Sequence, residues 1–585
     1  MTMQGRAVAV GGLREILVPG GGRLGGVAPV GPVGFPVLDP GSLSIDHDLL
    51  RTGSLETYLA EGWMPLERLP GRVLVGTSLP PGHHVLDGLA ARLGAPVQLV
   101  ALAPWALREH VLAVFDGEVA DAAANRLWRE QPVVSARIVL SRGQRTALWA
   151  ALAVVVPLVV LFPRPAAALA LGIGSAVFLA ATGFKLIVAM RGARFDVVEQ
   201  VTAEEVAALD DAGLPVYTVL VPVFREANIV AQLVENLGGL DWPASRLEVL
   251  VLVEEEDDET RAAIEAASPP EHFRIVTVPA GAPQTKPRAC NVGLSLATGE
   301  YLVIYDAEDT PDPDQLKKAL VAFRRGGDDL VCVQAALNYF NATENALTRM
   351  FTLEYSYWFD YMLAGLDASD LPIPLGGTSN HFRTDALRRL GGWDPFNVTE
   401  DADLGVRASA MGYRVGVINS TTMEEANTSI PNFVRQRSRW IKGYMQTTLV
   451  HARQPLELIA RIGLRRFLAF ALLIGGTPAV FLGVLPSYLV TGAVLLMPAS
   501  ITAGLFPAWV LWLCLLNFVL GNSLMIYLSM MGPYKRGNFN LVLWSLLNPV
   551  YWVLHSIASY KALWQLVTRP HYWEKTAHGL TTHVA

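Results

Sequence analysis

Four long apolar segments constrain this chain most, because each is long enough to cross a lipid bilayer. They cover residues 146–162, 165–190, 467–497 and 505–531. A helix needs about 20 residues to cross the hydrocarbon core. The composition agrees, since 52% of the residues are hydrophobic and only 17% are charged, against about a quarter charged in an average domain. The sequence therefore predicts two spans before the soluble stretch 196–455 and two after it.

The flanking charges give these spans an orientation. Basic residues precede and follow the first pair and follow the last span: Arg137, Arg142, Arg145, Arg191, Arg194, Lys535 and Arg536. Positive flanks favour the cytosolic side. We therefore expect a multi-pass protein of the cell inner (plasma) membrane with its soluble domain in the cytosol. The Pro-Arg-Pro turn at 163–165 makes a hairpin of the first pair, 146–190, and no cleavable signal peptide is expected.

The last apolar stretch, residues 539–567, has a different character. Polar residues such as Asn548, His555 and Lys561 alternate there with Trp544 and Trp552. A charged side chain in the middle of a span is costly, whereas an interfacial helix tolerates this mixture. We predict helices that lie at the cytosolic membrane surface among the lipids.

Net charge and cysteine spacing exclude other classes of protein. The formal net charge of −7 argues against nucleic acid as a partner, because phosphate binding needs a basic face. Cys290, Cys332 and Cys514 are too far apart in sequence to form a metal-binding motif or a disulfide framework. They are expected to pack as small apolar residues.

The N-terminal region divides into two parts. Residues 1–45 are rich in Gly and Pro and are predicted to be disordered. Residues 46–140 form a small α/β domain, with strands at 72–76 and 97–101 and helices around 84–93 and 107–111. This domain resembles the N-terminal domain of type II secretion ATPases, which in some relatives binds a cyclic dinucleotide through a Leu-rich motif. The motif is not found cleanly here, so we favour a docking or stabilising role.

Strands alternate with helices in the soluble stretch, at 216–223, 247–253, 274–278 and 301–305. This alternation predicts βαβ units and a mostly parallel sheet. Asp306, Glu308 and Asp309 directly follow the last of these strands. Carboxylates at that edge suit a hard divalent cation; the alternative is a solvated turn that caps the next helix. For Asp309 we expect helix capping rather than an auxiliary role at the cation.

An ordered series of motifs follows the same stretch: Pro222-Val-Phe224, an acidic run 254–258, Lys286-Pro-Arg, Asp306-Ala-Glu308, Gly376-Gly-Thr-Ser-Asn-His381, Thr399-Glu400-Asp401 and Gln436-Arg437-Ser-Arg439-Trp440. The series resembles family 2 glycosyltransferases of the cellulose synthase-like membrane branch, over residues 215–450. The resemblance implies an α/β fold in which a GT-A (Rossmann-like) domain is inserted between transmembrane helices.

The resemblance also implies residue roles. Asp306 and Glu308 match the DxD positions that hold Mg²⁺ or Mn²⁺ against the donor diphosphate, with Glu in place of the second Asp. Asp401, with Glu400 in the TED element, matches the catalytic base; helix capping is the alternative for Asp401 and is compatible with that role.

Further positions correspond to donor and acceptor contacts in the family. Glu254 is our first choice for the nucleoside contact and Glu256 the second. Trp440 offers a ring to the acceptor sugar, and His381 lies in a stretch that borders the acceptor. The other donor-side positions are Pro222, Phe224, Lys286, Gln436, Arg437 and Arg439.

The C-terminal residues 568–585 contain Trp573-Glu-Lys-Thr576 and His578-Gly579. They resemble the gating loop of cellulose synthase-like enzymes, and an ordinary polar tail is the alternative.

The leading hypothesis is an inverting enzyme that transfers a sugar from a nucleotide diphosphate sugar, a UDP-sugar by preference, to a growing polysaccharide. Single transfer to a lipid acceptor is the second hypothesis, and a non-catalytic membrane scaffold or sensor is the third. Four spans are few for a complete polymer channel, so an export partner or a homo-oligomer belongs to the first hypothesis.

Overall fold

The computed structural model describes residues 45–78, 83–194, 200–498, 506–575 and 581. The chain divides into two compact units, Met1–Val119 and Ala120–Ala585. The predicted disordered segment 1–45 lies almost entirely outside the described residues. The domain boundary predicted at residue 140 differs from the observed division, since residues 120–140 belong with the second unit.

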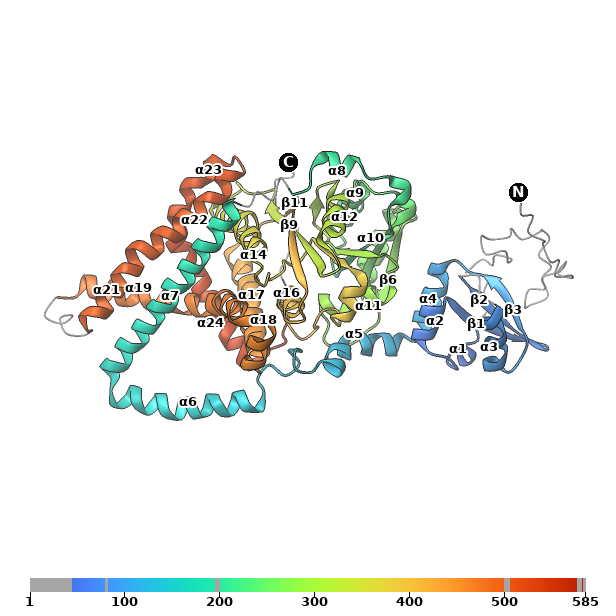
Figure 1. The fold of residues 1–585 in the computed structure, drawn as a ribbon, viewed down its shortest axis with the longest axis horizontal. Coiled ribbons are helices and arrows are strands. Elements are labelled where there is room, and N and C mark those ends of the chain that lie inside the picture. The colour runs from blue at the N-terminus through green and yellow to red at the C-terminus, as the bar shows by residue number, and fades with distance from the viewer. Residues whose placement is uncertain (1–44, 79–82, 195–199, 499–505, 576–580, 582–585) are drawn as a thin grey trace. The chain divides into compact units, whose positions relative to one another are not determined.

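The first unit is a three-stranded sheet with helices (Figure 1). Its strands are β1 (Trp63–Leu69), β2 (Arg72–Thr77) and β3 (Val97–Ala101), where β1 and β2 are antiparallel and β2 and β3 parallel. Its helices are α1 (His47–Leu50), α2 (Leu55–Glu61), α3 (His83–Leu93) and α4 (Pro104–Val114). Tyr58, Trp63 and Phe115 pack together in its core. The predicted strands and helices of this region are confirmed.

The second unit is built on an eight-stranded mixed sheet in the order β6-β5-β4-β7-β10-β9-β11-β8. Its strands are β4 (Tyr217–Val223), β5 (Leu247–Glu254), β6 (Phe273–Val278), β7 (Tyr301–Ile304), β8 (Thr310–Pro311), β9 (Leu330–Tyr339), β10 (Asn380–Arg383) and β11 (Arg414–Glu424). Strands β6, β5, β4 and β7 are parallel, as predicted, and β10 is antiparallel to both of its neighbours.

Strand direction places the ends of six segments at one edge of the sheet. The carboxyl ends of β4, β5 and β7 meet there because these strands are parallel. Strand β10 runs in the opposite direction, so the loop before β10 lies at this same edge. Strands β9 and β11 also end there. Ligand sites in open α/β sheets form at this edge.

Helices connect and cover the strands (Figure 1). They are α5 (Asp116–Glu130), α8 (Ala203–Ala207), α9 (Val230–Gly238), α10 (Asp258–Ala266), α11 (Lys286–Leu296), α12 (Gln315–Gly326), α13 (Ala346–Tyr357), α14 (Ala364–Ala368), α15 (Thr384–Arg389), α16 (Glu400–Ala410) and α17 (Ile430–His451). Val219, Val251 and Phe323 belong to the core on one side of the sheet. A second core joins the sheet to α13, α17 and the apolar helices.

The described residues include five helical segments long and apolar enough to cross a membrane: Arg142–Leu161, Pro163–Arg194, Pro455–Leu496, Ala508–Lys535 and Phe539–Thr568. They comprise α6 (Arg142–Leu161), α7 (Pro163–Arg194), α18 (Pro455–Phe470), α19 (Gly476–Leu496), α21 (Ala508–Leu516), α22 (Asn522–Lys535), α23 (Phe539–Val542) and α24 (Asn548–Thr568). These helices indicate membrane association. Each of the four predicted spans overlaps one of the first four segments. The interfacial placement of residues 539–567 stays a prediction.

The first two apolar helices do not pack along each other. Helix α6 buries none of its residues and diverges from α7, while α7 lies beside α19, α21 and α22 (Figure 1). The short turn predicted between the two helices is present, but the two helices do not pack against each other as a hairpin would. The apolar faces of α6 find no protein partner within the described residues, so contact with lipid would cover them.

Candidate active site

Lys286 is the first residue of α11 and lies at the sheet edge described above. Its ammonium forms an ion pair with the carboxylate of Asp306 and donates a hydrogen bond to the carbonyl oxygen of Gly377 (2.8 Å). A cation at a helix N-terminus opposes the helix dipole, so these acceptors compensate it. Burial lowers the pKa of Lys286, but the nearby carboxylates, Asp306 above all, raise it beyond its usual range. Lys286 is therefore a fixed positive charge.

The turn after β7 is held by Asp309. The carboxylate of this fully buried residue accepts hydrogen bonds from the Asp306 N–H (2.8 Å) and the Thr378 hydroxyl. Burial, followed by the charges of Asp306 and Glu308, raises the pKa of Asp309 well above its usual range. The expected helix-capping role of Asp309 is wrong, because α12 begins at Gln315 with Asp314 as its N-cap residue. Asp309 shapes the turn that carries Asp306 and Glu308, which are both half-buried.

Glu424 at the end of β11 is an additional acidic residue that the motifs did not reveal. It follows Met423, which pairs with Thr310 in β8, so the strand ends close to the Asp306 turn. Burial, followed by Asp309, Asp306 and Glu308, raises the pKa of Glu424 well above its usual range. The sequence pattern does not predict strand β11, and the position of Glu424 depends on that strand. In the described ranges, no three acidic, His or Cys side chains are grouped as a complete metal site.

The TED element forms the start of α16, where Glu400 is the first residue and Asp401 the second. Asp401 Oδ1 accepts a hydrogen bond from the Ala402 N–H (2.7 Å). A Cβ atom on Gly377 would lie 3.4 Å from Asp401 Oδ2 and 4.0 Å from Lys286 Nζ. Asp401 and Lys286 thus converge on Gly377, the glycine whose carbonyl Lys286 binds.

The two TED carboxyl groups differ in ionisation. Burial, reinforced by the charge of Asp401, raises the pKa of Glu400 to about 8. Burial also raises the pKa of Asp401, while the Ala402 N–H, Lys286 and Arg439 oppose that rise. Two adjacent carboxyl groups in one site do not readily ionise together. Lys286 and Arg439 act on both groups, whereas the charge of Asp401 raises the pKa of Glu400, so Asp401 is the member favoured to be ionised.

Helix α17 supplies Arg439 and Trp440, which are both half-buried. The Arg439 guanidinium stacks on the ring of Trp573 (4.5 Å), and its Nε has no hydrogen-bond partner within the described residues. Burial lowers the pKa of Arg439, and Glu400, Asp401 and Asp306 are the anions that act on it most. Trp440 stacks on Tyr355, with ring planes 29° apart and centroids 6.2 Å apart.

The other two residues of this motif are engaged inside the protein. Arg437 pairs with Glu354 (2.6 Å) and stacks on Phe351 and Trp440, both at 4.4 Å. Gln436 accepts a hydrogen bond from Asn427 (2.8 Å). The predicted phosphate contacts of Gln436 and Arg437 are not supported by this geometry, because both residues are buried and the Gln436 oxygen and the Arg437 guanidinium bind protein partners.

The two predicted nucleoside contacts at the end of β5, Glu254 and Glu256, differ in solvent exposure. Glu254 is buried and pairs with the fully buried Arg288 (2.6 Å), so the structure directs our first choice into the interior. Glu256 is exposed, accepts a hydrogen bond from Gln284 (3.1 Å) and lies 3.9 Å from Arg225. Glu256 replaces Glu254 as the acidic residue that a ligand at this edge could reach.

Phe224, just beyond β4, lies under the C-terminal segment. Lys575 Nζ donates to the Phe224 carbonyl (2.7 Å) and sits 3.9 Å from the centre of its ring. Pro222 is half-buried in the same strand end. Residues 570–575, which we call the C-terminal strap, thereby reach both Phe224 and Arg439. Thr576, His578 and Gly579 of the predicted gating loop lie outside the described residues.

His381 does not lie in this site. Its side chain is completely buried in β10, where Nδ1 bonds the Tyr217 hydroxyl (2.7 Å) and Nε2 bonds Gln315 Oε1 (3.1 Å). Burial lowers the pKa of His381 to about 3. The predicted acceptor contact of His381 is wrong, since a neutral core histidine with both nitrogens engaged has no group left to offer.

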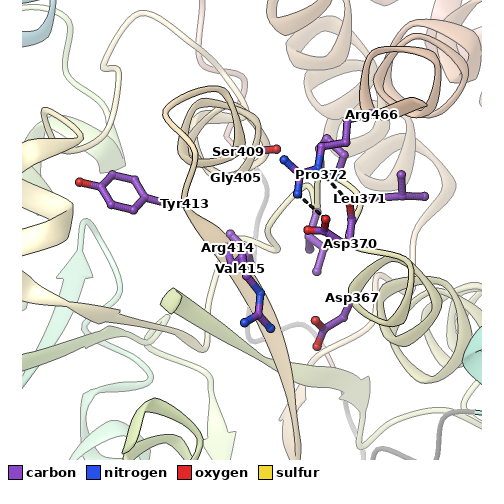
Figure 2. A pocket seen from close by; sticks show the side chains of 11 residues that line it. Asp367, Asp370, Leu371, Pro372, Gly405, Ser409, Tyr413, Arg414, Val415 and Arg466 are labelled. Carbon is purple, nitrogen blue, oxygen red and sulfur yellow. Dashed lines mark hydrogen bonds and ion pairs between the residues drawn. The ribbon is translucent and has the colours of Figure 1, made fainter. Parts of the chain in front are cut away.

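A separate polar pocket lies between α14, α16, β11 and α18 (Figure 2). Its lining includes Asp367, Asp370, Tyr413, Arg414 and Arg466, and none of the predicted site residues. The carboxylate and carbonyl oxygens of Asp370 bind Arg466. The cavity of about 20 Å³ has room for about one water molecule, so we assign no substrate to it.

Comparison with known families identifies two regions of the chain. Residues 215–443 match "Glycosyltransferase like family 2", and residues 33–121 match the "MshEN domain". The first match covers the sheet and all the site residues named above except those of the C-terminal strap. The second confirms the predicted resemblance of the N-terminal domain.

Curated relatives are similar over the same domain. The probable glycosyltransferase YdaM of Bacillus subtilis is 27% identical over 249 residues, 42% of this chain and 59% of that protein. Glucomannan 4-beta-mannosyltransferase 2 of Arabidopsis thaliana is 28% identical, over 40% of this chain and 45% of its own length. Beta-monoglucosyldiacylglycerol synthase of Trichormus variabilis is 28% identical, over 43% of this chain and 54% of its own length. The chain thus spans about half the length of the curated relatives it matches.

Among solved structures, the mannosyltransferase PcManGT of Pyrobaculum calidifontis, in complex with GDP-Man and Mn²⁺, is 20% identical with a TM-score of 0.44. That similarity covers 68% of this chain and 99% of the other. Glucosyl-3-phosphoglycerate synthase of Mycobacterium tuberculosis, in complex with Mn²⁺, uridine diphosphate and phosphoglyceric acid, is 16% identical with a TM-score of 0.29. This second similarity covers 46% of the present chain and 86% of the synthase chain.

Proposed function

We propose that this chain, whose residues 215–443 match the family 2 glycosyltransferases, transfers a sugar from a nucleotide diphosphate sugar to a glycan or lipid acceptor at a membrane. The convergence of Asp401 and the Lys286–Asp306 pair on Gly377 carries this proposal. It brings a candidate base and a fixed positive charge into one site. Sugar transfer needs both, because a proton leaves the acceptor while negative charge develops on the leaving diphosphate.

Asp401 would accept the proton of the acceptor hydroxyl as that hydroxyl attacks the anomeric carbon. The diphosphate leaves from the opposite face, so a single displacement inverts the anomeric configuration. The Ala402 N–H and the start of α16 orient the carboxylate and favour its ionised form. Glu400, whose pKa is raised to about 8, would keep its proton at neutral pH and leave the base role to Asp401.

Lys286 and Arg439 would bind the donor diphosphate, since both present cationic groups to the Asp401 region. Asp306 and Glu308 would hold a divalent cation, Mg²⁺ or Mn²⁺, which supplies Lewis-acid stabilisation of the diphosphate when bound. The residues fit this role: two half-buried carboxylates and no complete protein cage among the described residues leave positions for phosphate oxygens. Glu256, Pro222 and Phe224 would border the nucleoside, for which uridine is our first choice.

Trp440 would stack against the acceptor sugar beside Tyr355. The C-terminal strap would cover the donor, because it joins Phe224 to Arg439. Exclusion of water by such a cover limits hydrolysis of the donor.

A growing polysaccharide is our preferred acceptor, and a single lipid acceptor is the alternative. One curated relative is a glucomannan mannosyltransferase and another is a diacylglycerol glycolipid synthase, so both kinds of acceptor have a precedent among the relatives. The charge pattern of the spans supports the cell inner membrane with a cytosolic active site. An export partner or a homo-oligomer would complete a polymer channel, and the N-terminal domain would dock or stabilise the enzyme.

The test uses the full chain in lipid nanodiscs with Mg²⁺ or Mn²⁺ and a panel of nucleotide sugars. Release of nucleoside diphosphate identifies the donor, and mass analysis of the products distinguishes a polymer series from a single addition. No sugar transfer from any donor to glycan or lipid acceptors would overturn the proposal and favour a scaffold or sensor. A chelator should abolish transfer, and restoration by either cation would support the role of Asp306 and Glu308.

A further inference from the structure

Two separate segments of the second unit rest on the same part of α17. One is the base loop, residues 394–399, which leads directly into Glu400 and Asp401. The other is the C-terminal strap, residues 570–575. More than 170 residues separate the two in sequence, as the hydrogen bond from His571 Nδ1 to the Phe396 carbonyl (3.0 Å, 175 residues apart) shows.

The base loop is attached to α17 along three successive residues. Asn397 donates to the Thr447 hydroxyl (2.9 Å), and the Val398 N–H donates to Gln446 Oε1 (3.0 Å). Thr399 packs so closely on Gly443 that a Cβ there would lie 2.1 Å from its hydroxyl oxygen. Any shift of the loop relative to α17 would move the start of α16 and with it Asp401.

The strap is attached to the same helix by three hydrogen bonds, one of which runs from the Ser438 hydroxyl to the Glu574 carboxylate (3.2 Å). Lys442 Nζ donates to the Tyr572 carbonyl (2.7 Å), and Gln446 Nε2 donates to the Pro570 carbonyl (3.1 Å). The strap then places Trp573 on Arg439 and Lys575 on Phe224. Its seating on α17 therefore determines what lies over the donor side of the site.

Gln446 is the side chain that contacts both segments. It is completely buried; its oxygen accepts from Val398, and its amide group donates to Pro570 and, at 3.4 Å, to Phe396. An amide is suited to this position because it offers an acceptor and two donors without a charge. No hydrogen bond of Gln446 in the described structure goes to a residue with a proposed chemical role.

We propose that Gln446 is a positioning residue that couples the seating of the C-terminal strap to the placement of Asp401. The inference rests on the proposed function and adds to it a link between donor coverage and base alignment. Loss of the link would leave the donor open to water while the base is displaced from the acceptor.

The test measures two rates in nanodiscs with the donor found active: sugar transfer to acceptor, and nucleoside diphosphate release without acceptor. Gln446→Glu removes the amide donor and keeps an acceptor for Val398, and Gln446→Met is a second variant of similar size. Thr448→Val is the matched control, because the Thr448 hydroxyl donates only within α17, to Tyr444. We expect the ratio of hydrolysis to transfer to rise about tenfold or more in the Gln446 variants and to stay unchanged in the control.

A purely structural role of Gln446 would lower both rates together with the folded fraction and leave their ratio unchanged. An unchanged ratio in both Gln446 variants would thus overturn the coupling while wild-type transfer still supports the proposed function. Absence of transfer in the wild type would overturn the proposed function itself.

Discussion

Lys286 joins two parts of the candidate site: its ammonium pairs with the Asp306 carboxylate at the end of β7 and binds the Gly377 carbonyl before β10. These contacts cross two neighbouring strands that run in opposite directions. The two contacts of Lys286 therefore bring the Asp306 carboxylate of the proposed cation site close to Gly377, which Asp401 also approaches.

Asp401→Asn should reduce sugar transfer by about 10²- to 10⁴-fold, the usual contribution of a general base. The amide keeps an oxygen for the Ala402 N–H, so folding and donor binding should change little. Transfer is measured by product formation and donor binding by displacement of a fluorescent nucleotide. Wild-type turnover in this variant would contradict the assignment of the base.

Lys286→Met should raise the KM for the donor about 10- to 100-fold, because a hydrogen bond to a charged partner contributes about 1.5–3 kcal/mol. Steady-state kinetics with varied donor concentration provide the measurement. The control is Lys318→Met, which breaks the pair of Lys318 with Asp314 (3.0 Å) at the start of α12, where neither residue has a proposed role in the site. Equal effects of both substitutions would argue against a donor contact of Lys286.

Glu400 should make the folded state less stable as the pH rises. Its folded pKa of about 8 lies above the ordinary value of 4.5, so the folded state binds the proton more tightly than the unfolded state. This stabilisation is present below pH 4.5 and is lost as the pH rises towards 8. Thermal unfolding of Glu400→Gln should therefore depend less on pH across this window than that of the wild type. Parallel pH profiles for the two proteins would contradict the raised pKa.

Gly192→Ala should destabilise the packing of α7 on the soluble domain. A Cβ at this position would lie 2.0 Å from the Tyr361 carbonyl oxygen and 2.8 Å from the Gly365 nitrogen, so the backbones would have to separate. Overpacking of this kind costs about 1–3 kcal/mol, which thermal unfolding in detergent can detect. Gly183→Ala in the same helix meets no atom within 4 Å and should be close to neutral. A wild-type melting temperature for Gly192→Ala would argue that α7 does not pack this tightly.

The strands β4 to β7 were predictable because their apolar runs are short, continuous and bounded by turn residues. Strands β9 and β11 were not predicted, and Glu424 at the end of β11 was missed with them. The long apolar helices were predictable from length and composition. The open angle between α6 and α7 was not.

Side-chain direction separates the predicted site residues that face the TED carboxyl groups from those that face the protein interior. Arg437 and Arg439 are two positions apart on α17, yet only Arg439 faces the TED carboxyl groups; Arg437 finds Glu354, 83 residues earlier in the chain. Glu254 and His381 likewise bind Arg288 and Tyr217 in the interior. No local pattern encodes such partners.

The sequence by itself determined the apolar helices, the α/β character of the domain between them and the order of its acidic and basic motifs. These depend on hydrophobic periodicity and residue type, which are local properties. Only the tertiary structure decided that Asp401 and Lys286 meet at Gly377, that Asp309 holds the turn and that Gln446 joins the base loop to the C-terminal strap. The physical reason is that these contacts link segments far apart in the chain, and burial leaves each polar group a single set of partners.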